Sequence, residues 1–482
     1  MKLPAKVPTL VSAVVAALLA GCAVGPDFQR PDPPHAEQYV APKPVAADAT
    51  AADRQVLLLG ESPTSEWWHF FHSDALDRIV ERALAGNRRL TAEQWSLAQA
   101  QELVSAKAGG RWPQVDATAG LGRQKYGAQF LGPLPKPPPF TYFSVGATVS
   151  YSLDFTGNLT RTIEQQQALA EYQQHQVEAA QLTVTGNAVN QALEVASLRA
   201  QIATVEALLD RDRENLKLVQ LAFDAGSVSR LDVVSAESQL ASDTTVLPSL
   251  RQQLAQARHA LALTLGTAPA DPSLLDLDLA QLTLPPQLPV SLPSELARRR
   301  PDILAAESQL HAATAAVGVA ASNLYPRIDL TGTTGQQSIS TGQLFDSASN
   351  VWSIASGLVA PIFDGGTLRA EKRAAVDAMR SSAANYEQTV LAAFGQVADS
   401  LEALDNGAAQ LQAQANAEAA ARDTVTMTRQ SYHEGNVGVL QVLDAERRYQ
   451  QARLGYVRAQ AQRYMDTAQL MLALGGAGPT AL

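Results

Sequence analysis

VWSIASGLVAPIFDGGTLRAEKRAAV, residues 351–376, contains the change of pattern that decides the fold. A strand-like run of apolar and small residues passes through FDGG, residues 363–366, into a charged, alanine-rich segment of helical character. The same order of features occurs earlier, in FSVGATVSYSLDFTGNLTRTIEQQQA, residues 143–168. Trp352 lies 209 residues after Phe143, and the two stretches align on that spacing. The sequence therefore predicts two copies of one unit.

Each copy contains a pair of segments with strand character. In the first copy these are residues 115–125 and 143–155, and in the second copy they are residues 326–336 and 350–362. Apolar residues alternate strictly with polar or small ones over 143–155, which indicates a strand with two different faces. The alternation is poorer over 350–362, where the repeat is the main reason to predict a strand.

The length of the four strands suits a membrane as well as a soluble sheet. Each is about as long as a transmembrane β-strand, which needs roughly 9 to 11 residues. An open four-stranded sheet would leave unpaired backbone edges in lipid, so strands that enter a membrane must be pooled between chains. Three chains would supply about twelve, an even number within the known range of closed barrels. The alternative is a soluble sheet with one wet face.

Long helical hairpins follow each strand pair. Residues 158–223 contain no proline and predict a helix of roughly 98 Å at about 1.5 Å per residue. The chain then turns at Gly226 and returns in a shorter helix to about Gly266, which we expect to be kinked at Pro248. The second copy repeats this with residues 367–434 and 438–474. Near the end of the first long helix a coiled-coil spacing with one polar member is formed by Val205, Leu209, Asp212, Leu216, Val219 and Phe223.

The N-terminus has the features of a targeting segment. Residues 1–21 carry two lysines ahead of a short apolar run, as a signal peptide does. Cys22, the only cysteine of the chain, ends a Leu-Ala-Gly-Cys tetrapeptide that resembles the lipobox of bacterial lipoproteins. The alternative is an incidental cysteine beside an ordinary cleavage site. Residues 22–64 are rich in proline and predict an extended, lipidated leash.

Composition and motifs argue against several function classes. The net charge is −10, and no basic patch with interleaved aromatic residues appears, so a nucleic-acid partner is not expected. His69 and His72 stand three residues apart, but no third ligand is near them, and we predict no metal site. The seven histidines are scattered, and no nucleophile with a plausible base is evident. We therefore expect no enzymatic activity and no cofactor.

Several motifs together resemble the TolC-like outer membrane efflux family, in its lipidated NodT-type branch. They span nearly the whole chain after the signal peptide: Leu19 to Cys22, Trp67-Trp68, RRPDILAAE at 299–307, PIFDGG at 361–366 and VLDAERR at 442–448. The resemblance implies a mixed, mainly α fold and a homotrimer. In it, four strands per chain build a twelve-stranded transmembrane β-barrel that continues into a long periplasmic α-helical barrel. A small equatorial domain would come from residues 267–300 and the termini.

The resemblance also implies a function. The chain would be a passive exit duct in the outer membrane, extending into the periplasm. It would conduct small toxic compounds delivered by an inner-membrane resistance-nodulation-division pump through a periplasmic adaptor. Cys22 would carry S-diacylglycerol and N-palmitoyl groups in outer membrane lipid. A non-conducting lipoprotein scaffold and a type I protein-secretion duct are the alternatives.

Functional positions follow from the same resemblance. The adaptor-docking tips would be Gly226 and Ser227 in the first hairpin and Gly435 and Asn436 in the second. Residues implied for the periplasmic entrance gate are Asp444, Gln441, Asp232 and Tyr432. The domain boundaries we expect are 1–21 (signal peptide), 22–64 (leash), 65–266 (first repeat), 267–300 (equatorial segment), 301–475 (second repeat) and 476–482 (tail).

Overall fold

The computed structural model describes the chain except for residues 1–22, 33–37, 41–54, 126–137, 272–275 and 477–482. The described residues form two compact units. Unit 1 takes them from Met1–Pro31, Leu97–Gln173 and Ala306–Tyr386, and unit 2 from Asp32–Ser96, Gln174–Ala305 and Glu387–Leu482. Each unit thus contains parts of both sequence repeats.

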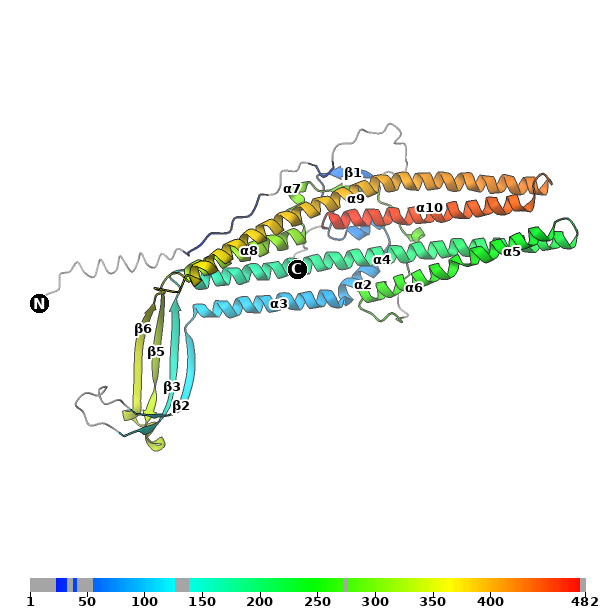
Figure 1. The fold of residues 1–482 in the computed structure, drawn as a ribbon. Coiled ribbons are helices and arrows are strands. Elements are labelled where there is room, and N and C mark those ends of the chain that lie inside the picture. Colours follow the sequence, from blue (N-terminus) through cyan, green and yellow to red (C-terminus); the bar gives the residue numbers. More distant parts are fainter. Residues whose placement is uncertain (1–22, 33–37, 41–54, 126–137, 272–275, 477–482) are drawn as a thin grey trace. The chain divides into compact units, whose positions relative to one another are not determined.

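Unit 1 contains a four-stranded antiparallel sheet in which the two repeats join. Its strands are β2 (Gln114–Gln124), β3 (Phe140–Leu153), β5 (Arg327–Ser338) and β6 (Asn350–Val359). They lie in the order β2-β3-β5-β6 (Figure 1), so β3 of the first repeat pairs with β5 of the second. The strand β6 ends earlier than expected, just before Pro361, which has no N–H for the ladder.

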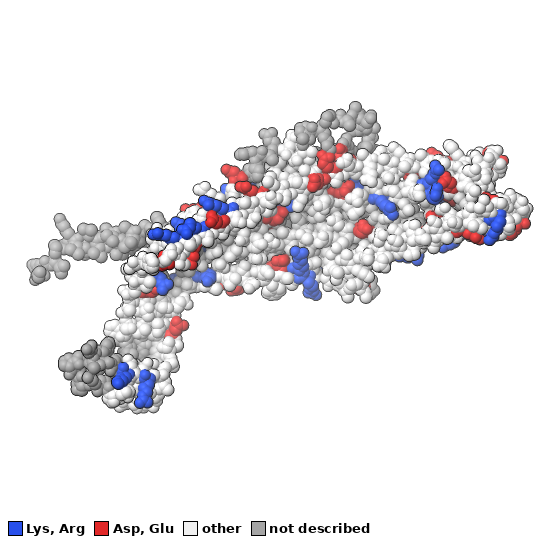
Figure 2. Space-filling model, viewed as in Figure 1, with Lys and Arg blue, Asp and Glu red and all other residues white. Residues whose placement is uncertain are grey.

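The register of the strands gives the sheet two chemically different faces. One row of facing residues is apolar or small and crosses all four strands: Val115, Val149, Gly332 and Ile354. The next row, on the opposite face, is polar: Asp116, Thr148, Thr333 and Ser353. Residues of β6 whose alternation looked poor in the sequence, such as Trp352 and Leu358, lie on the apolar face. Figure 2 shows few charged side chains over the strands on the face in view.

At the strand-to-helix junction of each repeat, the carboxylate of an aspartate caps the start of the helix. Asp154 accepts hydrogen bonds from the backbone N–H groups of Leu159 (2.9 Å) and Thr160 (2.8 Å) at the start of α4 (Asn158–Asp224). Asp364 does the same for Gly366 (2.8 Å) and Leu368 (2.9 Å) at the start of α9 (Thr367–His433). These backbone donors lower the pKa of Asp364. The FDGG stretch is therefore a helix N-terminus, and its two glycines have positive φ.

The remaining helices of unit 1 are shorter. They are α3 (Arg88–Ala108), which begins in unit 2 and ends in a 3₁₀ turn at Gly109–Arg111, and α8 (Pro301–Ser322), which also begins in unit 2. In the part of the chain that is described, no helix has the length and apolarity needed to cross a membrane.

Unit 2 contains the later parts of α4 and α9 and the returning helices of the two hairpins, which differ. In the first repeat the return is broken into α5 (Arg230–Thr244) and α6 (Val246–Thr264), with Thr245 between them. Pro248 is the third residue of α6, where its missing N–H is tolerated, so the break precedes the proline. The second repeat returns in one uninterrupted helix, α10 (Val439–Ala473). The predicted kink is thus present as a break in the first hairpin alone.

A small parallel sheet and a helix complete unit 2. The strand β1 (Val56–Leu59) pairs with β4 (Gln287–Val290). Four residues of the predicted leash, 22–64, are thus hydrogen-bonded in a sheet. The helix α2 (Asp74–Gly86) is capped by Ser73, whose hydroxyl accepts from the N–H of Leu76 (3.4 Å). The helix α7 (Pro293–Leu296) follows β4.

Candidate functional site

Both hairpins end in the same type of turn. In the first, Gly226 has a φ of 73° and the N–H of Ser227 donates to the carbonyl oxygen of Ala222 (2.8 Å). In the second, Gly435 has a φ of 78° and the N–H of Asn436 donates to Ser431 (2.8 Å). These are Schellman caps, in which glycine adopts the left-handed conformation at no steric cost. The four residues proposed as docking tips therefore form two matching turns.

An apolar cluster in unit 2 joins the ends of the two hairpins. Its members come from four helices and their turns: Val219, Val233, Ala236, Val439 and Leu443, with Leu216, Phe223, Val228 and Tyr432 packed against them. Three of these residues, Leu216, Val219 and Phe223, belong to the coiled-coil spacing predicted from the sequence. The seam of the first long helix is thus confirmed as a buried contact.

Two of the expected gate residues have local roles in the structure. The carboxylate of Asp232 accepts from the backbone N–H of Ser229 (2.8 Å) and from its hydroxyl (2.7 Å), which caps α5. These hydrogen bonds lower the pKa of Asp232. Tyr432 packs in the apolar cluster at the hairpin ends. Within this chain, Asp232 therefore stabilises its own helix, and the structure does not bring its carboxylate into a hydrogen bond with Tyr432.

The other two expected gate residues lie together on α10. Gln441 and Asp444 line a shallow hollow of about 430 Å³ with Thr424, Thr428, Leu440, Ala445 and Arg448. The half-exposed carboxylate of Asp444 forms ion pairs with Arg447 (2.7 Å) and Arg448 (2.9 Å) of the same helix. Sequence reasoning missed these partners, although their spacing of three and four residues places them on one helix face.

A buried acidic cluster was also missed. Asp212, the polar member of the predicted seam, is 4% exposed, and Glu446 on α10 is 3% exposed. Glu446 accepts from Arg429 on α9 (2.9 Å from Nε and 2.5 Å from Nη2) and from the amide of Asn215. Burial and the nearby carboxylate of Asp243 raise the pKa of Asp212 to about 7. The signal in the sequence was the single acid in an apolar spacing.

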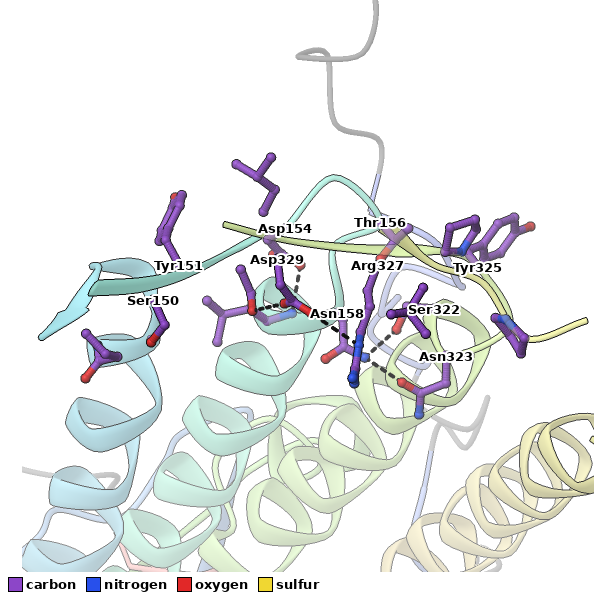
Figure 3. Close-up of a pocket in the computed structure, with 18 of the residues that line it drawn as sticks. Ser150, Tyr151, Asp154, Thr156, Asn158, Ser322, Asn323, Tyr325, Arg327 and Asp329 are labelled. Atoms are coloured by element: carbon purple, nitrogen blue, oxygen red, sulfur yellow. Dashed lines mark hydrogen bonds and ion pairs between the residues drawn. The ribbon is translucent and has the colours of Figure 1, made fainter. Parts of the chain in front are cut away.

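A polar hollow lies where the sheet of unit 1 meets the helices (Figure 3). It has a volume of about 760 Å³. The amide of Asn158 donates to Ser322 (2.7 Å) and Asn323 (2.9 Å), which ties the start of α4 to the end of α8. Arg327 pairs with Asp329 (3.4 Å) on β5. The hydroxyl of Ser152 on β3 donates to the same Asp329 (2.5 Å), so these contacts join neighbouring helices and neighbouring strands at the junction.

Potential metal ligands are dispersed over the described residues. Among them no group of three or more histidine, cysteine or acidic side chains is placed to hold a metal ion. His69 binds Asp77 (2.9 Å) and Glu66 (3.4 Å) instead, in a half-exposed setting. Cys22, the predicted lipidation site, lies outside the described residues.

Comparisons with known proteins agree with this architecture. The sequence model of the outer membrane efflux protein family matches residues 79–267 and 292–476. The solvent efflux pump outer membrane protein SrpC of Pseudomonas putida is 30% identical over 95% of this chain and 96% of its own. The probable outer membrane lipoprotein SilC of Salmonella typhimurium is 28% identical, with 95% and 96% covered.

A solved structure gives the same result for the fold. The outer-membrane channel OprN superimposes with a TM-score of 0.85 at 29% identity, over 95% of this chain and 99% of that one. The expected TolC-like, mainly α fold with a four-stranded antiparallel sheet is thereby confirmed.

Proposed function

The chain belongs to the outer membrane efflux protein family, and from that premise we propose that it is the exit duct of a tripartite efflux system. It lies in the outer membrane and extends into the periplasm. Its duct passively conducts small toxic compounds that an inner-membrane pump of the resistance-nodulation-division type and a periplasmic adaptor deliver. The observation that carries the proposal is the four-stranded sheet with one apolar face and two open edges.

The open edges support a homotrimer. In the part of the chain that the structure describes, the strands β2 and β6 each pair on one side only, so each presents a row of unpaired backbone groups. Such a sheet is not viable in lipid unless the edges are closed. Pairing β2 of one copy with β6 of the next would close a ring, and three copies would give about twelve strands. The apolar row with Val149 and Ile354 would then face lipid, and the polar row with Thr148 and Thr333 would face the lumen.

The N-terminal segment supports a lipid anchor on Cys22. Two residues after this cysteine, the N–H of Val24 donates to the carbonyl oxygen of Thr156 (3.1 Å) at the strand–helix junction. Asp27 then pairs with Arg161 (2.5 Å). The chain is thus fastened to unit 1 next to the strand ends, where an acylated Cys22 would reach the membrane surface.

Replacing the cysteine tests the anchor. Cys22→Ser should abolish incorporation of labelled palmitate while the trimer still forms, because sheets rather than acyl chains would span the membrane. The measurement is metabolic labelling followed by determination of the oligomeric mass. Palmitate retained in the variant would contradict the lipoprotein proposal.

The matching Schellman turns are the proposed docking surface for the adaptor. Both tips leave open space around the glycine, so a bulky side chain there would meet the partner and not this chain. In a strain that lacks the chromosomal copy, Gly435→Trp should restore less pump-dependent resistance than the parent chain does. The control is Gly435→Asn, because asparagine tolerates the left-handed conformation whereas tryptophan there costs about 1–2 kcal/mol.

The two variants separate docking from folding. Both should form trimers in the outer membrane, and only the tryptophan variant should lose resistance. Full resistance with Gly435→Trp would mean that the docking site lies elsewhere. Loss of resistance in both variants would mean that the effect comes from the backbone conformation of the turn.

A further inference from the structure

Asp212 occupies a position that disfavours a charged carboxylate. It lies on α4 in the same seam as Leu209 and Val219, which are 2% and 1% exposed, and is itself 4% exposed. No hydrogen-bond donor of the described residues reaches its Oδ2 atom, which is buried. An ionised carboxylate that is neither solvated nor paired is costly in such a place. The Oδ2 atom therefore needs a hydrogen-bond donor that no N–H or hydroxyl group of the described residues supplies.

The charged groups around Asp212 make its ionisation still less favourable. The carboxyl group of Asp243 on α5 lies within hydrogen-bonding reach of it, and Glu446 on α10 adds a second negative charge. The cation of the cluster is Arg429 on α9, whose Nε and Nη2 atoms both donate to Oε1 of Glu446. Gln239 donates to Asp243 (2.6 Å) but carries no charge. Asp212 and Asp243 are thus two neighbouring acids, and neither forms an ion pair with a cation of the described residues.

We propose that Asp212 and Asp243 bind one shared proton at neutral pH, and that this proton holds α4 against α5 below the tip of the first hairpin. A proton between the two carboxyl groups supplies the donor that Oδ2 of Asp212 lacks, and removes one of two like charges. When it dissociates, the two carboxylates repel each other, and the hairpin loosens. The cluster is therefore a proton-binding site with a mechanical effect on the hairpin.

The pH window follows from the direction of the shift. The pKa of Asp212 is raised in the folded chain to about 7, above its usual value of 3.8. The folded state then binds more protons than the unfolded state between these values, so stability falls as pH rises through that range and levels off above it. This is opposite to the behaviour of a capping acid such as Asp232, whose lowered pKa makes its contribution fade as pH falls.

Thermal unfolding of the purified full chain tests the site. From about pH 5 to about pH 8 the Tm of the parent should fall, and Asp212→Asn should lose this slope, because the carboxamide is a permanent donor to Asp243. The matched control is Asp210→Asn. Asp210 stands on the same turn but is 75% exposed and pairs with Arg213 (2.6 Å), so this variant should keep the slope of the parent.

Two further readouts guard against a variant that fails to fold. In the parent, the infrared band of a protonated carboxyl group should be present at about pH 6 and decline towards about pH 8. The Tm should not respond to a chelator, because the ligand is a proton. An unchanged slope in Asp212→Asn, a missing carboxyl band in the parent, or a chelator-dependent Tm that indicates a bound cation would each overturn the proposal.

Discussion

Acidic side chains of this chain differ in role because their surroundings differ. Asp364 and Asp232 accept backbone hydrogen bonds at helix starts, and both have a lowered pKa. Asp444 is half-exposed and bound by two arginines of its own helix. Asp212 is buried against a second acid. A carboxylate is therefore a cap, an ion-pair partner or a proton site according to the donors within reach.

Asp444 is the residue on which the proposed entrance gate depends. Three copies of its carboxylate in a narrow mouth should favour cations. Asp444→Asn should lower the cation-to-anion permeability ratio by roughly fivefold, which corresponds to about 1 kcal/mol. It should also weaken block by multivalent cations added on the periplasmic side, measured as single-channel current.

The arginine beside it supplies the matched control. Arg448→Gln removes one cation from Asp444 and should shift the permeability ratio in the opposite direction. If current, selectivity and block are the same in Asp444→Asn as in the parent, Asp444 does not line the entrance.

At the scale of elements, the strand β6 carries neighbouring residues for the two faces of the sheet. Ile354 and Ala355 are neighbours in its middle and point to opposite faces of the sheet. Ile354 is 83% exposed in the single chain and belongs to the apolar row. Ala355 faces Thr331 across the strand pair, on the polar side. In a barrel, the first would meet lipid and the second the lumen.

These neighbours allow a matched pair of substitutions. Ile354→Arg should cost about 2–4 kcal/mol of barrel stability if it lies near the bilayer midplane, whereas Ala355→Arg should cost little. The measurement is denaturant unfolding of the protein in bilayers, with the amount assembled in the outer membrane as a second readout. Equal effects of both substitutions would contradict the assignment of the faces.

Sequence patterns predicted the long elements well. The strand pairs and both 67-residue helices lie within a few residues of their expected bounds, since repeats, proline and periodicity mark them. We predicted a kink at Pro248, whereas the helix breaks at Thr245. The sequence shows the proline but not which turn of the helix accommodates it. The pairing of β1 with β4 joins segments more than 200 residues apart and has no local signal.

The site was less predictable than the fold. The glycine turns at the hairpin ends follow from the sequence, because glycine adopts their left-handed backbone conformation at no steric cost. The partner of Asp212 does not, since Asp243 reaches it only when α4 and α5 pack together. The motif singled out Asp444, but its ion pairs with Arg447 and Arg448 became evident only from the geometry of the helix.

At the scale of the whole molecule, the central claim is that several copies close one conducting duct. A single chain has a sheet with two open edges. Its long helices carry apolar seams that are already used within the chain at the hairpin ends. The edges of the sheet are therefore the part of the described structure that most needs a second copy.

Conductance of the purified protein across a planar bilayer tests this claim most directly. The account predicts stepwise single-channel currents from a particle with the mass of three chains, without any pump or energy source, because the duct is passive. A monomeric particle, or a trimer that inserts but carries no current when the periplasmic ends are open, would contradict it.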